Sequence, residues 1–93
     1  MFDTSKLASF WKFKEELYDE DTLNVFFGEC RGDDTIGICW DDYPKSRGET
    51  LTPICLDKKL SNIILNGLLM DALHENNSEQ IEKIIKIKEK LQK

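Results

Sequence analysis

Few residues of this chain could do acid–base or nucleophilic chemistry. Its only histidine is His74, and its three cysteines are Cys30, Cys39 and Cys55. The cysteines show no C-x-x-C spacing, and no spacing links them to His74, so neither a zinc site nor a thiol–imidazole pair is indicated. We expect no enzyme, no cofactor and no metal. We interpret the cysteines as reduced, buried thiols, with a Cys30–Cys39 disulfide or a reactive thiol as the alternatives.

Two pairs of adjacent aspartates, Asp33-Asp34 and Asp41-Asp42, are the remaining candidates for binding a cation. Their spacing lacks the pattern of an EF-hand loop. The stretch 43–48 carries two cations, a hydroxyl and a glycine, but it lacks the strand and helix that flank a phosphate-binding loop. Binding of another macromolecule is therefore favoured over an enzyme.

Charge is distributed unevenly along the 93 residues, which have a net charge of −5. Between residues 15 and 42, ten acids accompany a single base, whereas the last 11 residues carry five lysines and one glutamate. Such an acidic stretch argues against direct nucleic-acid binding and suits a basic partner, the alternative being a solvated surface. The candidate partner-binding residues are Glu15, Glu16, Asp19, Glu20, Asp33, Asp34, Trp40, Asp41, Asp42 and Tyr43.

The elements that position these residues can be predicted from hydrophobic spacing. Residues 5–19 show apolar side chains at helical spacing, which predicts an amphipathic helix. Two features fit it poorly. Phe13 lies off the apolar stripe, and the acids of the last turn oppose the helix dipole.

The middle of the chain predicts strands. Residues 22–31 and 35–40 alternate apolar and polar side chains, and Gly32 lies in the short connection between them, which predicts an antiparallel hairpin. Gly28 and Gly37 lie inside these strands, where a bulge or the close approach of a backbone or a ring would explain them. We expect an exposed loop over 41–50 and a short third strand over 51–56.

The last third of the chain predicts two helices, over 58–74 and 78–92. Asp57 suits the cap of the first, and Asn77 followed by Gln80 resembles a capping box for the second. The first is apolar on most of its circumference, so we expect it to be the most buried element, with Ile64 and Leu68 in the core. Gly67 predicts a close backbone approach.

The predicted fold is therefore α+β, in the order α-β-β-β-α-α. We expect a single domain over residues 1–93, with a small antiparallel sheet covered on one face by the helices. A homodimer through the open face of the sheet is left open. No run of 18 apolar residues and no signal peptide are visible, so we expect a cytoplasmic protein that does not contact a membrane.

The small size, the acidic stretch from Glu15 to Asp42 and the lack of a catalytic set together resemble the small acidic immunity proteins of bacterial toxin systems, including contact-dependent growth inhibition. Lysines outnumber arginines 11 to 2 and there are nine isoleucines, which fits an AT-rich bacterial gene. The resemblance implies a protein that binds a cognate toxin, often a basic nuclease, and covers its active site. It implies no particular fold. The alternative is a small structural or regulatory subunit of a larger complex, including one of phage origin.

Overall fold

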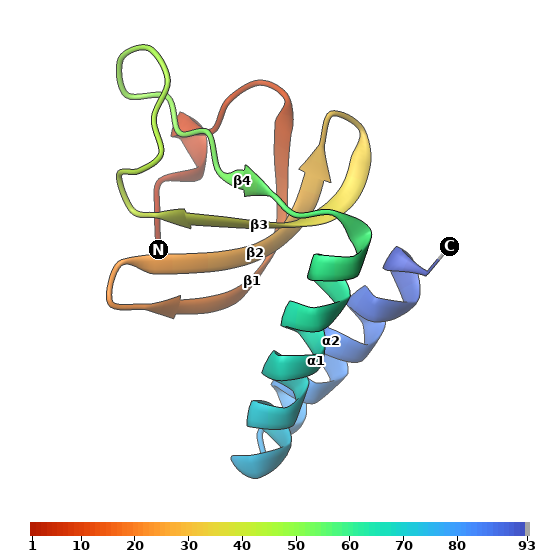
Figure 1. Cartoon of the computed structure of the whole chain (residues 1–93). Coiled ribbons are helices and arrows are strands. Elements are labelled where there is room, and N and C mark those ends of the chain that lie inside the picture. The colour runs from red at the N-terminus through yellow and green to blue at the C-terminus, as the bar shows by residue number, and fades with distance from the viewer. Residues whose placement is uncertain (93) are drawn as a thin grey trace. The chain divides into compact units, whose positions relative to one another are not determined.

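The computed structural model describes residues 1–92 and confirms an α+β chain with a small antiparallel sheet, in the order β-β-β-β-α-α (Figure 1). The chain divides into two compact units, Met1–Leu56 with the sheet and a second unit from Asp57 onward with the helices. The elements are the 3-10 helix η1 (Thr4–Lys6), the strands β1 (Trp11–Glu20), β2 (Leu23–Cys30), β3 (Asp33–Trp40) and β4 (Ile54–Cys55), and the helices α1 (Lys58–His74) and α2 (Ser78–Leu91).

The predicted N-terminal helix over 5–19 is wrong, because most of that segment is β1. Trp11 and Phe13 point to the same face of the sheet, as alternate residues of a strand do. The pairing of β1 with β2 then shifts register twice, between Phe13 and Glu15 and between Glu16 and Tyr18. Each shift adds a residue and breaks the period of two, so the apolar side chains fall at helical spacing without forming a helix.

Two tight hairpins build the sheet, whose strands follow the order β1-β2-β3-β4. The predicted strands over 22–31 and 35–40 are confirmed as β2 and β3. Asp21 and Thr22 connect β1 to β2, and Arg31 and Gly32 connect β2 to β3. All four residues have positive φ, between 51° and 89°, as in the two-residue type I′ turns that match the twist of paired strands.

An aromatic cluster packs on one face of this sheet. The Phe26 ring lies 4.9 Å from that of Trp11 and 5.3 Å from that of Phe2, measured between centroids. A Cβ added to Gly37 would lie 2.5 Å from the Phe26 ring, and one added to Gly28 would lie 2.3 Å from the carbonyl oxygen of Lys12. The close approach expected at both strand glycines is therefore confirmed, by a ring at Gly37 and by the backbone of the bulged strand at Gly28.

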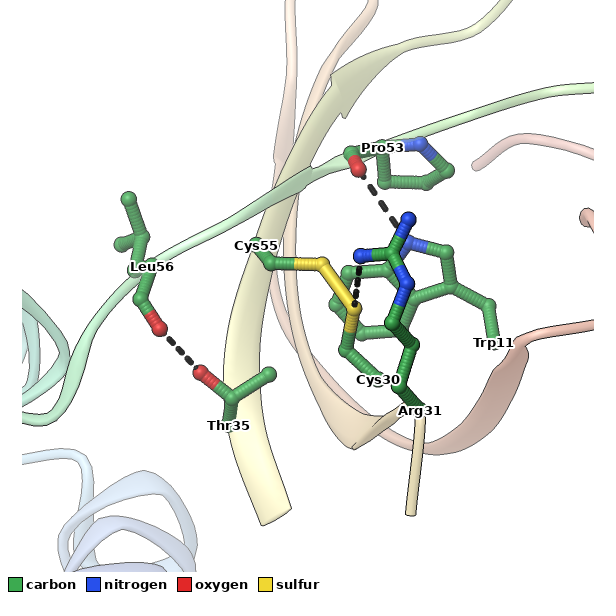
Figure 2. The surroundings of a disulfide bond; sticks show 7 residues. All are labelled: Trp11, Cys30, Arg31, Thr35, Pro53, Cys55 and Leu56. Atoms are coloured by element: carbon green, nitrogen blue, oxygen red, sulfur yellow. Dashed lines mark hydrogen bonds between the residues drawn. A yellow bond between two sulfur atoms is a disulfide. The ribbon is translucent and has the colours of Figure 1, made fainter. Parts of the chain in front are cut away.

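A disulfide between Cys30 and Cys55 ties the end of β2 to β4 (Figure 2). The prediction that all three thiols are reduced is therefore wrong for these two. A Cys30–Cys39 bridge is excluded by the register, since Cys39 pairs with Asn24, about 20 Å along β2 from Cys30. The predicted strand over 51–56 shortens to the two residues of β4.

Side-chain contacts hold β4 in place on either side of the disulfide (Figure 2). The buried indole Nε1 of Trp11 donates to the carbonyl of Pro53 at 3.1 Å, and the Thr35 hydroxyl donates to the carbonyl of Leu56. Next to the bridge, the Arg31 guanidinium lies 4.4 Å from the centroid of the Phe10 ring. The disulfide therefore adds a covalent link to a two-residue strand that few backbone hydrogen bonds hold.

Both predicted helices and both caps are confirmed. Asp57 Oδ1 accepts from the Leu60 N–H at 2.8 Å, and Asn77 Oδ1 accepts from the Gln80 N–H at 3.2 Å. The predicted core positions are wrong, because Ile64 and Leu68 are half-buried whereas Leu65 is fully buried. β2, rather than α1, is the most buried element. A helix apolar on most sides offers no periodicity that selects its buried face.

Candidate functional site

The pairing of the strands gathers five carboxylates at one end of the sheet. Glu20 pairs with Leu23, which pairs with Trp40, so the β1–β2 turn lies beside the residues that follow β3 (Figure 1). The Asp41 N–H donates to the carbonyl of Thr22 at 2.9 Å and confirms this contact. We call this group the acidic end, and its members are Asp19, Glu20, Asp21, Asp41 and Asp42.

A buried amide holds the two segments of the acidic end together. Asn24 is 1% exposed, and its Nδ2 donates to Asp41 Oδ1 at 2.8 Å and to the carbonyl of Thr22 at 3.3 Å. These bonds brace Thr22, a β-branched residue at φ 66°, in a conformation that such residues rarely adopt. The acidic end is therefore fixed by the sheet rather than carried on a loose loop.

An exposed aromatic pair borders the acidic end. The rings of Trp40 and Tyr43 lie edge to face with centroids 6.1 Å apart, and the side chains are 41% and 62% exposed. The Trp40 N–H donates to the carbonyl of Tyr43 at 2.7 Å, so Asp41 and Asp42 form the tight turn between the two rings. Two large rings are thus held in water, next to carboxylates on either side.

The field of these acids acts on a nearby cation. The Met1 amino group lies 2.9 Å from Asp19 Oδ2, and this hydrogen bond raises the pKa of the amino group. The charges of Asp41 and Glu16 raise the same pKa further. Carboxylates of β1 and of the residues after β3 therefore both act on the Met1 amino group.

Of the other predicted acids, Glu16 adds its charge at the Met1 amino group, but Asp33 and Asp34 lie at the opposite end of the sheet, so the candidate residues do not form one face. Asp34 is the second residue of β3 and lies at the opposite end of the sheet, about 23 Å from Asp41. There the Lys14 ammonium lies 2.9 Å from Asp34 and 3.5 Å from Glu29, and it offsets their charge. Asp33 stands beside the adjoining turn.

Glu15 and Glu16 lie midway along β1, which is an edge of the sheet. Their register places Glu15 opposite Phe27 and Glu16 opposite Phe26, so the two carboxylates point to opposite faces. Charges and bulges on an edge strand hinder pairing with another chain.

The residues that could act as nucleophile, base or ligand are not brought together. Cys39 is buried, and this burial raises the pKa of its thiol to about 11. His74 ends α1 and is exposed. Within residues 1–92, no three histidine, cysteine, aspartate or glutamate side chains are grouped so as to hold a metal ion. In the 41–50 loop the Lys45 cation is paired with Glu49 at 3.1 Å.

Sequence reasoning missed Asn24 and Asp21. An amide at an inward position of an otherwise apolar strand was the available signal for Asn24, since such a group needs a hydrogen-bonding partner. Asp21 could be placed only after the segment before it was recognised as a strand that ends in a two-residue turn.

No protein-family model, curated protein or solved structure matches this chain. No helix within residues 1–92 has the length and apolar character that crossing a membrane requires. The function must therefore be argued from the acidic end and its aromatic pair.

Proposed function

We propose that this protein binds a basic protein partner through the acidic end and the Trp40–Tyr43 pair. The observation that carries the proposal is the exposed, edge-to-face aromatic pair beside five carboxylates held by the sheet. Tryptophan and tyrosine are the side chains most often found at the energetic centre of protein interfaces. As the concrete form of this activity, we propose an immunity protein that covers the active site of a nuclease toxin.

The two kinds of residue would act on different steps of binding. The carboxylates attract a basic surface over several ångströms and so raise the association rate. The rings desolvate on contact and offer their faces to lysine or arginine side chains, which slows dissociation. Because the Asn24 and Thr22 contacts hold the site in place, little ordering would oppose binding.

The proposal does not depend on a cytoplasmic location. Disulfides persist mainly in oxidising compartments, so the Cys30–Cys55 bridge counts against the reducing compartment expected from the sequence. An inhibitor needs only to meet its partner, which it could do in either compartment.

The test is a binding series by surface plasmon resonance, with the protein encoded by the adjacent gene as the partner. Reversal of Glu20 and Asp42 to lysine should slow association and flatten its salt dependence. The matched control reverses Asp33 and Asp34, which changes the net charge equally at the opposite end of the sheet. We expect the control to alter the association rate less.

Truncation of the aromatic pair should act on dissociation instead. Trp40→Ala should speed it about 30-fold, which corresponds to about 2 kcal/mol. Both side chains are exposed, so thermal stability should stay near that of the parent. An association rate indifferent to salt and to both charge reversals, with unchanged dissociation of Trp40→Ala, would refute the proposal.

A further inference from the structure

A stripe of apolar side chains lies exposed along α1. Leu60, Ile63, Met70 and Leu73 are between 48% and 65% exposed. They recur at spacings of three and seven residues and so follow one side of the helix. Buried Leu65 and Ala72 mark the opposite side. Single exposed apolar residues are common, but a row of four on one helix face indicates a surface that another protein covers.

Gly67 lies midway along this stripe, and because it has no side chain the helix backbone is accessible there. A glycine inside a helix costs about 1 kcal/mol relative to alanine, and a close backbone approach is the usual reason to keep one. Within residues 1–92 no atom outside the glycine's own stretch of helix lies within 4 Å of where its Cβ would be. The close approach predicted from the sequence is therefore not made within the described part of the helical unit, residues 57–92, and space remains there for a helix from another molecule.

The distribution of charge along α1 indicates which partner would suit the apolar stripe. Lys58 and Lys59 stand at the N-terminal end of the helix, whereas Asp71 and Glu75 stand at its C-terminal end. A second copy of α1 laid antiparallel would set each positive end against a negative end, and the helix dipoles would also oppose. A parallel copy would set like charges together.

We propose that this chain forms a homodimer through antiparallel packing of α1 on α1, with the two-fold axis at Gly67. The two glycines then face each other. Ile63 of each copy lies level with Met70 and Asp71 of the other, and Lys59 lies level with Glu75. A two-fold axis makes the interface self-complementary, as closed dimers require. This proposal does not rest on the proposed function, whose residues belong to the first unit.

Sedimentation equilibrium of the full chain between about 1 and 100 µM should show a monomer–dimer equilibrium. Ile63→Lys places a charge on the stripe and should raise the dimer dissociation constant about tenfold or more. The matched control is Ile54→Lys in β4, because Ile54 and Ile63 are 50% and 52% exposed. A chain that stays monomeric over this range, or that is weakened equally by both variants, would overturn the proposal.

Cysteine cross-linking tests the direction of packing. Gly67→Cys should form a dimer disulfide on mild oxidation, because the two residues meet at the axis. Leu60→Cys should not, since antiparallel packing separates the two copies of residue 60 by about 20 Å. The native Cys39 thiol is buried and should leave the parent chain uncross-linked as a blank. Equal cross-linking of both variants would indicate parallel packing and would overturn the proposed arrangement.

Discussion

Loss of the Cys30–Cys55 disulfide should destabilise the sheet unit more than any surface change. The bridge closes a loop with a sequence separation of 25 residues. The loss of loop entropy in the unfolded chain then predicts about 3.5 kcal/mol of stabilisation at 25 °C. For a unit of this size, each kcal/mol moves the melting temperature by about 4–8 °C, so we expect reduction to lower it by about 15–25 °C.

The structure gives a reason to expect the full effect. β4 pairs with β3 through only two residues, Ile54 and Cys55. Beyond that pairing it is held by the disulfide, by the Trp11–Pro53 hydrogen bond and by the Thr35–Leu56 hydrogen bond. Without the bridge, a short edge segment would have to stay docked through these few contacts. Its separation would expose the aromatic cluster around Trp11 to water.

The assay is thermal unfolding followed by tryptophan fluorescence, with and without a reductant. Both tryptophans, Trp11 and Trp40, lie in the sheet unit, so the signal reports on that unit alone. The double variant Cys30→Ser, Cys55→Ser is the control, because it should melt at the low temperature whether or not reductant is present. A parent whose melting temperature moves by less than about 3 °C on reduction would refute the reasoning.

Three further outcomes are expected. Leu65→Ala should lower the free energy of unfolding by about 2–5 kcal/mol, measured by circular dichroism in urea, and Leu68→Ala should lower it clearly less, because only Leu65 is fully buried. Equal losses for the two variants would show that the buried side of α1 is assigned wrongly. Gly28→Ala should cost about 1–3 kcal/mol in the same assay, since its Cβ would press on the Lys12 carbonyl and β1 would have to move; a neutral result would contradict the close packing of the bulge. Cys39 should react with a thiol reagent at pH 8 at least about 100-fold more slowly than in the unfolded chain, because its pKa of about 11 lies above the ordinary value of 9.0 and leaves less thiolate. The reaction rate should rise with pH, and rapid labelling at pH 8 would show that the thiol is not buried.

Local chemistry explains which elements were predictable. β2, β3 and α2 each carry a regular apolar pattern, and α1 is a long, mostly apolar segment. Gly32, Asp57 and Asn77 mark the ends of these elements with residues that suit a turn or a cap. Each of these signals acts over a few residues, so it can be recognised without the rest of the fold.

β1 shows where local patterns fail. Its two bulges hide the alternation of a strand, and the spacing that remains resembles a helix. The features that fitted a helix poorly were informative. Phe13 belongs to the aromatic cluster against Phe26, and the acids near Glu20 lead into a turn rather than end a helix. Pairing with β2 overrides the helical spacing in this segment.

The sequence alone determined that the chain is acidic and that it contains a central hairpin followed by two helices. Only the tertiary structure decided which acids lie together, because strand register places Asp41 beside the β1–β2 turn and Asp34 at the far end. It also decided that Cys30 pairs with Cys55, and which side of α1 is buried. These outcomes depend on contacts between residues distant in the chain, and no local spacing encodes such contacts.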